Sequence, residues 1–464
     1  MKSEEKSKKK KMELDEDIIE KVTELIMKEF RVQRKDISKP ILTLRDMEKL
    51  VTQLSKKVHI AMLSNMLLSE KSRLATQKKN CPKCKASLKY EGKRSKTVHT
   101  VHGNLKIPRH YYRCPSCSYS WYPEDEAFHI TSGKLSSCLS ELACLIALST
   151  SYEETARIIG MIIDENVTPD TIERCVKEIG SKLYNVELQN AEELHESGIS
   201  TLPEAPDETA QEERIYLQID GSSVNTREGG WKENKLAIAY KESDVQKCGK
   251  DKEGRIRIKY KDFISSIGPR KVNLIKFKKL LLGLLKRIGA FSAKEVVVIA
   301  DGAVWIHSLV TKLIPNVVFI LDWYHVTSHL GACAQELFGE KSKKGEEWIA
   351  RYKELIWDGK ISEALTNLLS EADGAKKQTP LRKLYAYLNR RKECMKYDEY
   401  REKGYHIGSG AVESANKYLV QKRLKQAGMK WSFQGANAIV ALRIHFLKNI
   451  WDDIWDRSNP IWAT

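Results

Sequence analysis

The sequence lacks any apolar run long enough to cross a membrane. A helix that spans a bilayer needs about 18–20 consecutive apolar residues, and no such run occurs among the 464 residues. An export signal is also missing, because the lysine-rich residues 1–12 lead into the acidic stretch 13–17 instead of an apolar core. We therefore expect a cytoplasmic protein with no membrane partner.

Negative charge is comparatively scarce. The chain has 62 Asp and Glu residues against 79 Lys and Arg residues, a formal net charge of +17. A cationic excess favours polyanionic partners, because bound Lys and Arg side chains release counterions from phosphates. Nucleic acid is therefore the favoured partner, although ribosomal proteins, nucleases and membrane-surface proteins carry similar charge, and a solvated surface also explains it.

Two stretches lack one sign of charge altogether. Residues 183–213 contain no Lys or Arg, and their second part, 189–213, is predicted to be an acidic linker. Residues 414–450 contain no Asp or Glu. Their cationic residues are Lys417, Lys422, Arg423, Lys425, Lys430, Arg443 and Lys448.

Four of the ten cysteines form two C-x-x-C pairs, Cys81 with Cys84 and Cys114 with Cys117. Two such turns can place four thiolates tetrahedrally around Zn²⁺, and the strand-like segment between them would close a zinc ribbon over residues 76–125. Free thiols or a redox role are the alternatives. The surrounding cations, among them Lys83, Lys93 and Arg109, make nucleic-acid contact a further expectation.

Three short helices are expected after the ribbon. The patterns predict helices over about 135–148, from Ser151 with Glu154 as a capping-box partner, and from Pro169 at a first helical position. A tight break before the last helix is typical of a helix-turn-helix unit. A small three-helix packing unit without DNA contact explains the pattern equally well.

Two aspartates are predicted at strand ends in the following α/β region. An alternating strand, 214–220, ends in Asp220-Gly221, and a buried strand, 295–300, is followed by Asp301-Gly302 and a helix. Further strands are expected over 235–242, 255–263 and 317–321, with an apolar helix over 271–289. A turn or a favourable helix dipole explains one such aspartate, but not why two separate strands end in Asp-Gly.

Two more candidate groups follow. Glu413 begins a predicted long helix after the loop 404–410, where pairing with Lys417 is the structural explanation. His325 closes the segment Asp322-Trp323-Tyr324-His325, where a structural hydrogen bond is the alternative to a catalytic or DNA-contacting role. Carboxylates of this kind suit phosphodiester chemistry, which uses two Mg²⁺ (or Mn²⁺) ions about 3.5–4 Å apart.

At this point the ordered motifs are similar to those of a known family. The set comprises Asp220-Gly221, Asp301-Gly302-Ala303, the DWYH segment at 322–325, GSGAVE at 408–413 and RLKQAGMKWS at 423–432. Together they resemble bacterial insertion-sequence transposases of the Kra-type family, which are related to the mutator-like DDE enzymes. The similarity runs from about residue 77 to 455.

The resemblance implies an RNase H-like catalytic domain with an all-helical insertion. It implies a triad of Asp220, Asp301 and Glu413, with Asp322 and His325 in the D-x-x-H signature of mutator-like enzymes. It further implies cut-and-join chemistry on the terminal repeats of an element and on target DNA, recognition by the zinc ribbon and helix-turn-helix, at least a homodimer in the synaptic complex, and a nucleoid-associated protein. A domesticated DNA-binding protein without activity and a hydrolytic nuclease of the same fold are the alternatives.

The expected fold class is therefore α/β and multidomain. The predicted parts are a basic tail with helices (1–75), the zinc ribbon (76–125), helix-turn-helix-like helices (126–188), the acidic linker (189–213), the first part of the RNase H-like domain (214–330), the helical insertion (331–403) and the C-terminal part with Glu413 (404–464).

Overall fold

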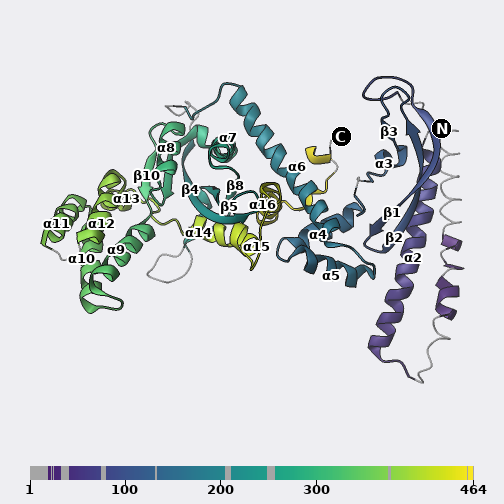
Figure 1. The fold of residues 1–464 in the computed structure, drawn as a ribbon, viewed down its shortest axis with the longest axis horizontal. Coiled ribbons are helices and arrows are strands. Elements are labelled where there is room, and N and C mark those ends of the chain that lie inside the picture. Colours follow the sequence, from purple (N-terminus) through teal and green to yellow (C-terminus); the bar gives the residue numbers. More distant parts are fainter. Residues whose placement is uncertain are drawn as a thin grey trace. The chain divides into compact units, whose positions relative to one another are not determined.

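The protein has a mixed α/β, multidomain fold, which confirms the coarse prediction (Figure 1). The computed structural model describes residues 19–21, 23–24, 26–32, 41–74, 80–130, 133–203, 211–247, 256–374, 378–456 and 458–462. The chain divides into two compact units, Met1–Val176 and Lys177–Thr464. Residues 1–18 of the predicted tail-and-helix region, 1–75, and residues 204–210 of the predicted linker lie outside the described residues.

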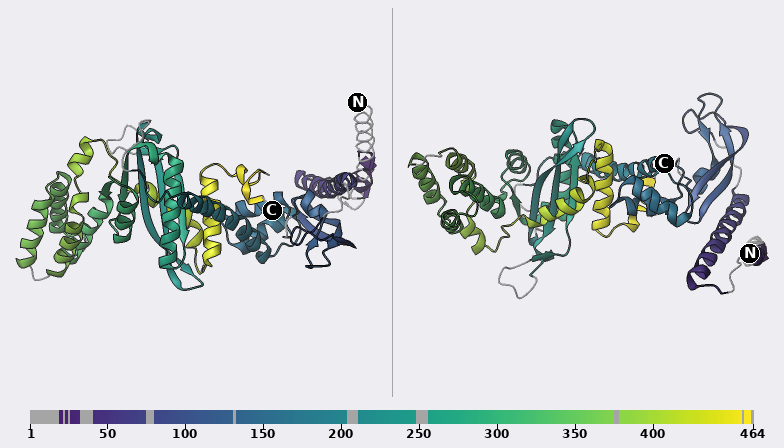
Figure 2. Two further views of the ribbon diagram at one scale, coloured as in Figure 1. Left: turned by 90° about the horizontal axis from the view of Figure 1, so that it is seen from above. Right: turned by 60° about the horizontal axis from the view of Figure 1, so that its bottom comes forward.

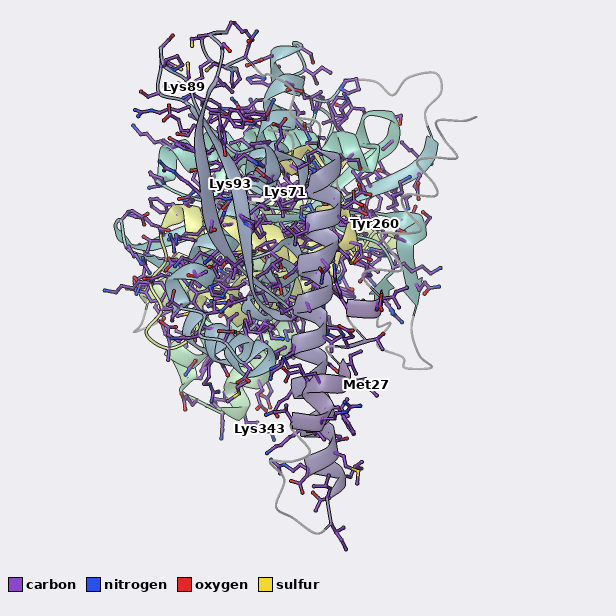
Figure 3. All side chains as sticks on the ribbon, turned by 90° about the vertical axis from the view of Figure 1, so that its right-hand side faces the viewer. Met27, Lys71, Lys89, Lys93, Tyr260 and Lys343 are labelled. Carbon is purple, nitrogen blue, oxygen red and sulfur yellow. The ribbon has the colours of Figure 1, made fainter. Side chains whose placement is uncertain are left out.

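A three-stranded antiparallel sheet carries the cysteine pairs in the first unit. Its strands are β1 (Lys89–Thr100), β2 (Gly103–Arg113) and β3 (Ser120–Trp121). Helix α2 (Leu44–Arg73) packs against β2, with Leu63 and Leu67 covering a core of Val98, Leu105 and Ile107. Lys71 (Figure 3) extends this contact, because its ammonium lies 3.0 Å from the buried carboxylate of Glu124.

The three predicted helices after the sheet are present. They are α4 (Ser137–Ala147), α5 (Tyr152–Ile163) and α6 (Pro169–Glu196), preceded by the short α3 (Pro123–Ala127). Ser151 caps α5 by accepting a hydrogen bond from the Glu154 N–H at 3.1 Å. Helix α6 continues to Glu196, so residues 189–196 of the predicted linker are helical. Its apolar face explains this, since Ala191 and Leu194 are buried.

The second unit is built on a five-stranded sheet in the order β10-β9-β4-β5-β8. Strands β4, β5 and β8 pair in antiparallel fashion, whereas β9 and β10 run parallel to β4. The strands are β4 (Gln211–Thr226), β5 (Gly230–Lys241), β8 (Asp262–Ile267), β9 (Ala293–Ala300) and β10 (Val318–Leu321).

Helices cover both faces of this sheet (Figure 1). Helices α7 (Arg270–Ile288) and α8 (Val304–Leu313) lie on one face, and the segment that begins with α14 (Gly410–Ala415) lies on the other. Burial on both faces explains why the central strands read as near-continuous apolar runs, such as the fully buried residues 296–300 at the end of β9.

Three predicted element boundaries are wrong. Strand β4 continues six residues beyond Asp220, to Thr226, because β5 pairs with it over that whole length. The predicted strand 255–263 is two strands: β7 (Ile256–Ile258), which pairs with β6 (Val245–Lys247), and the sheet strand β8. The predicted long helix after residue 411 is broken into α14, a π-helical turn η4 (Asn416–Gln421), α15 (Lys422–Leu424) and the separate α16 (Phe433–Leu447).

The predicted insertion contains helices and connecting turns, and no strand, among its described residues. Helices α9 (Trp323–Phe338), α10 (Lys343–Trp357), α11 (Ile361–Gly374), α12 (Gln378–Arg390) and α13 (Tyr397–Glu402) gather beside the β10 edge of the sheet (Figure 2). Packed rings of Trp323, Trp357 and Tyr397 join them, with centroids 4.7–6.1 Å apart. Across the part of the chain that the structure describes, no helix is both long enough and apolar enough to cross a membrane.

Candidate functional site

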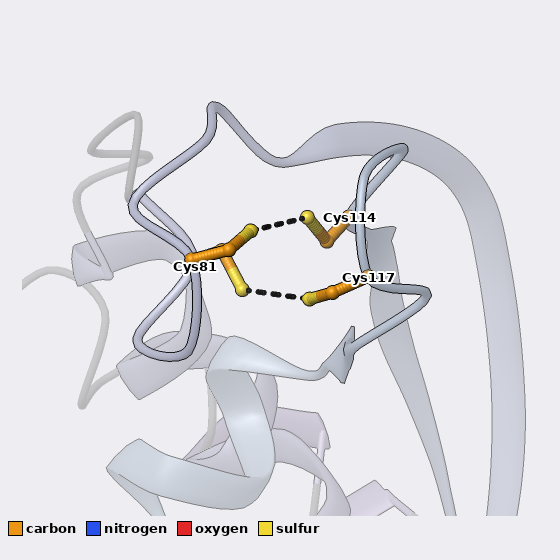
Figure 4. A group of neighbouring side chains, drawn as sticks. Cys81, Cys114 and Cys117 are labelled. Atoms are coloured by element: carbon orange, nitrogen blue, oxygen red, sulfur yellow. Dashed lines mark hydrogen bonds between the residues drawn. The ribbon is translucent and has the colours of Figure 1, made fainter.

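The four predicted cysteines meet in one cluster (Figure 4). The Sγ atoms of Cys81 and Cys117 lie 3.4 Å apart, as do those of Cys84 and Cys114, and all four sulfurs lie within 4.8 Å of one another. Four thiolates bound to Zn²⁺ at about 2.3 Å would lie about 3.8 Å apart. The cluster therefore has the size and the donor set of a structural zinc site.

The backbone around the two cysteine pairs has the same geometry twice. The Cys81 N–H donates to Ala86 and the Lys85 N–H to Cys81, just as the Cys114 N–H donates to Tyr119 and the Ser118 N–H to Cys114. Lys85 and Ser118 both adopt positive φ, at 62° and 60°. In each turn, backbone N–H groups point at the sulfurs, and the N–H of Cys117 is the main cause that lowers the pKa of the Cys114 thiol to about 6. The pKa of Cys81 is also lowered, whereas hydrogen bonds from neighbouring thiols raise the pKa values of Cys84 and Cys117. Two of the four thiols are thus biased toward the thiolate that a metal needs.

A row of three aspartates crosses the second unit's sheet. The last registered row of the parallel strands pairs Ile219 of β4 with Ala300 of β9, and Ala300 with Leu321 of β10. The next residue along each strand is an aspartate: Asp220, Asp301 and Asp322. Neighbouring strands lie about 4.8 Å apart. The structure therefore brings the two predicted aspartates to adjacent positions and adds a third, and we call these three residues the acid row.

Asp322 is the member of the acid row that sequence reasoning treated only as part of a motif. Its side chain is fully buried, and it caps α9 by accepting a hydrogen bond from the His325 N–H at 3.0 Å. Its other oxygen accepts from the Ser409 N–H at 2.6 Å. The available signal was its position directly after a buried strand, the same position that Asp301 has.

Gln218 and Asp322 together hold the loop that leads to Glu413. The buried amide of Gln218 accepts from the Val412 N–H at 3.0 Å and donates to the Gly408 carbonyl at 3.2 Å. Because Gln218 and Asp220 are two residues apart on β4, they point to the same face of the sheet. Glu413, in the first turn of α14, is thereby attached to the strand that carries Asp220.

Asn416 makes a second attachment, directly to the acid row. Its Nδ2 donates to a carboxylate oxygen of Asp220, and its Oδ1 accepts from the Ser222 hydroxyl at 2.9 Å. Burial raises the pKa of the Asp220 carboxyl, and the charge of Asp301 adds to this rise. The hydrogen bonds from Asn416 and Gly221 oppose it without cancelling it. Asp220 is thus a carboxylate that a nearby cation would stabilise.

His325 is oriented by Asp322. Its Nδ1 lies 2.7 Å from the Asp322 carboxylate, which leaves Nε2 as the nitrogen available to another group. This hydrogen bond raises the pKa of His325 against the opposing effect of burial. The charges of Asp301 and Glu413 act in the same direction as the hydrogen bond. Orientation by a buried carboxylate is typical of histidines that bind a metal or transfer a proton.

The structure departs from the predicted triad in one respect, which concerns the residues that lie closest to Glu413. Among the described residues of this unit, the possible metal ligands whose donor atoms lie within 4.8 Å of one another are Asp322, His325 and Glu413. Asp220 and Asp301 lie beside this set through the strand register, and the charge of Asp301 raises the pKa values of both Asp220 and His325. All four predicted catalytic residues therefore belong to one neighbourhood.

The predicted insertion holds the acid row from the other side. Tyr387, in α12, donates to the Asp301 carbonyl at 3.3 Å, and Arg391 donates to the Gly302 carbonyl at 3.3 Å. The buried Tyr397 donates to the Leu321 carbonyl at 2.7 Å. Gly302 adopts φ +73°, and a Cβ there would lie 2.6 Å from the Leu321 side chain. The helices therefore support the turn that follows β9.

The cations after Glu413 fall into two groups. Lys417, Lys422, Lys425 and Lys430 are exposed. By contrast, Arg423 and Arg443 are buried and Lys448 pairs with Asp262 at 2.7 Å. Arg443 donates to the Tyr418 and Leu419 carbonyls of the π-helical turn η4. The buried cations thus stabilise the broken helix, and only the exposed lysines remain for a polyanion.

Comparison with known protein families places the chain in one of them. The profile described as Uncharacterised protein family (UPF0236) matches residues 37–452. The chain belongs to this family. The matched region includes the cysteine cluster, the acid row and Glu413, so both sites of this chain lie within it. No curated protein matches the sequence.

Proposed function

We propose that the protein is a DNA transposase that cleaves and joins DNA at the acid row. The observation that carries the proposal is the row itself, in which three aspartates occupy the same register position on three parallel strands and Glu413 is held beside them. Turn formation or helix capping explains a single aspartate. It does not explain three in one row, of which one is buried and one carries a raised pKa.

The fold supports this proposal. We assign the sheet of the second unit to the RNase H-like class, since three antiparallel strands are continued by two parallel ones and helices lie on both faces. In this assignment Asp220 lies on the central strand and Asp301 follows its parallel neighbour. The helices α10 to α13 are then the insertion between Asp301 and Glu413.

Asp220, Asp301 and Glu413 are the residues that would hold Mg²⁺ or Mn²⁺. Their carboxylate oxygens are the donors that these hard cations prefer. Burial, together with the charge of Asp301, raises the pKa of Asp220, and a bound cation would offset both effects. Two bound ions would activate the attacking oxygen and stabilise the leaving oxygen. Two metal ions would lie about 3.5–4 Å apart. Three carboxylates that bind them would therefore not have to meet at one point, as they do not in this structure.

The remaining groups have assigned roles around this centre. The Asp322 carboxylate holds His325 so that Nε2 can accept or donate a proton at the attacking or leaving oxygen, and we call His325 catalytic on that basis. The exposed lysines between Lys417 and Lys430 provide phosphate contacts that position the DNA backbone. We further propose that the cysteine cluster binds zinc and that the ribbon, with a helix-turn-helix formed by α4 to α6, recognises the element's ends.

Partners and location follow from the reaction. A transposase must hold two DNA ends and a target together, so we propose that at least a homodimer acts, in association with the nucleoid. A nuclease of the same fold would need only one duplex and would release a hydrolysed end.

Strand-transfer products separate these functions. We would incubate the purified protein with a labelled oligonucleotide that ends in the element's 3′-hydroxyl, a supercoiled target plasmid and Mg²⁺. A transposase joins the label to the plasmid, because the 3′-oxygen attacks a target phosphorus and displaces a target 3′-oxygen. Asp220→Asn, Asp301→Asn and Glu413→Gln should each abolish joining and leave DNA binding intact. Cleavage without joined products would identify a nuclease, and specific binding without either reaction would identify a domesticated DNA-binding protein.

A further inference from the structure

The outer face of the zinc-ribbon sheet carries a row of aromatic rings. Register pairs Tyr90 of β1 with Tyr112 of β2, and Tyr112 with Trp121 of β3. The ring centroids are 5.3 Å apart for Tyr90 and Tyr112 and 5.2 Å apart for Tyr112 and Trp121. His110 lies beside this row, with its ring 5.9 Å from that of Tyr90, and its Nδ1 is hydrogen-bonded to the buried carboxylate of Glu124 at 2.6 Å. We call these four residues the aromatic row.

This face is not the one that forms the core of the ribbon. Side chains alternate between the faces of a strand, and on β2 the residues Leu105, Ile107 and Tyr111 are buried while Lys106 and Tyr112 are not. Helix α2 covers the buried face through Leu63 and Leu67. Tyr90 in particular is 47% exposed. The aromatic row is thus not required to fill the core.

Exposed cations share the face with the aromatic row. Lys93 of β1 lies opposite His110 of β2. Lys106 lies on the same face of β2 as His110, four residues earlier in the strand. Both lysines are exposed, and Lys93 is labelled on the ribbon in Figure 3.

By contrast Arg109 points to the other face, where it pairs with Asp125 at 2.5 Å. Arg109, expected among the DNA-contacting cations, is therefore used within the fold.

We propose that this face of the ribbon binds single-stranded nucleic acid, with unpaired bases stacked on the aromatic row and phosphates held by Lys93 and Lys106. It combines rings and cations, as do surfaces that bind single strands without reading their sequence. A duplex would offer its phosphates to the same lysines, but its bases are stacked on one another and cannot reach the rings. This proposal does not depend on the chemistry assigned to the acid row.

The test is a binding titration of the full-length, zinc-loaded protein without Mg²⁺ or Mn²⁺, so that no cleavage can occur. Fluorescence anisotropy would follow a labelled twelve-nucleotide oligo(dT), an oligo(rU) of equal length and a duplex. Because a stacked base contributes about 1–3 kcal/mol, Tyr90→Ala should raise the Kd for the single strands at least about fivefold and leave the Kd for the duplex unchanged. Tyr90→Phe keeps the ring and should bind like the wild type.

Matched controls come from the second unit. Tyr260 is 46% exposed and Lys343 is also exposed, and both are labelled in Figure 3. Tyr260→Ala and Lys343→Ala should change neither affinity nor salt dependence. Lys93→Ala should reduce the slope of log Kd against log salt by about 0.7, the value for one phosphate of a single strand.

Three results would overturn the proposal. They are no binding of either single strand by the wild-type protein, an unchanged Kd in Tyr90→Ala, and an equal loss of affinity for single strands and duplex in that variant. A tighter Kd for oligo(dT) than for oligo(rU), or the reverse, identifies the strand chemistry that the face prefers.

Discussion

Replacing Gln218 with leucine should test whether Gln218 positions Glu413 or only stabilises the second unit. Gln218 is 1% exposed and holds the loop before α14 through Val412 and Gly408, while its Nε2 also donates to the Tyr240 hydroxyl at 3.0 Å. Leucine has a similar volume but no hydrogen-bonding group. The substitution therefore removes the attachment of α14 to β4 without opening a large cavity.

The expected magnitudes follow from these contacts. Each neutral hydrogen bond contributes about 0.5–1.5 kcal/mol net, and a buried partner left unsatisfied costs about 1–3 kcal/mol. Val412 and Tyr240 are both buried, so we expect the free energy of unfolding to fall by about 2–5 kcal/mol. A displacement of a catalytic group by about 1 Å can slow a reaction about 100-fold, which is the loss of cleavage rate that we expect.

Asn437 offers a matched control in the same unit. Its amide accepts from the Ile267 N–H at 3.0 Å and donates to the Ile267 and Phe433 carbonyls at 2.9 Å, so it attaches α16 to the edge strand β8. Urea unfolding and single-turnover cleavage would be measured for both leucine variants below their unfolding transitions. Asn437→Leu should lose comparable stability but keep its rate per folded molecule. Equal cleavage rates in the two variants would refute the positioning role of Gln218.

Three further predictions concern the metal centre, the turn after β9 and a buried ion pair. Cys114→Ser removes one of the four thiolates and should therefore lose bound zinc, and with it much of the about 10–16 kcal/mol that a structural site contributes. One zinc per chain of the variant, measured by atomic absorption, would contradict this. Gly302→Ala should lower the unfolding free energy by about 1–2 kcal/mol because of its positive φ, and an unchanged midpoint would show that the turn relaxes. Asp262→Asn should destabilise by about 2–4 kcal/mol at pH 7 because Arg287 and Lys448 lose their carboxylate. Those cations outweigh burial and lower the pKa of Asp262 below its ordinary 3.8, so its contribution is complete at neutral pH and is lost only as the pH falls below about 4. A wild-type advantage that persists unchanged at pH 2 would contradict this assignment.

The strand ends and the cysteine pairs could be read from the sequence because they depend on local patterns. Apolar β-branched runs followed by Asp-Gly marked Asp301, and C-x-x-C spacing marked the four cysteines that cluster. Asp220 was also found, although its strand does not end there. Strand β4 continues because β5 pairs with it as far as Thr226, and a local pattern does not show where a distant partner stops. The later alternation of Ser222, Val224 and Thr226 was the available signal.

The arrangement around Glu413 depends on contacts between distant residues and could not be predicted locally. Gln218 precedes Val412 by 194 residues, and Asn416 lies as far from Ser222. The helix after Glu413 breaks into a π-helical turn whose carbonyls accept from Arg443, about 25 residues further along. Such turns are frequent at functional sites. An amide in the buried part of β4, residues 215–219, was a signal that Gln218 must satisfy some other backbone group.

The most direct test of the account compares the wild-type protein with Asp301→Asn on a plasmid that carries the element with its native flanking sequence. The wild-type protein should cleave and join this DNA only when Mg²⁺ or Mn²⁺ is present. Asp301→Asn should bind the same DNA with unchanged affinity and give no product. Full activity of Asp301→Asn, or activity of the wild-type protein without a divalent metal, would contradict the assignment of the acid row as the catalytic centre.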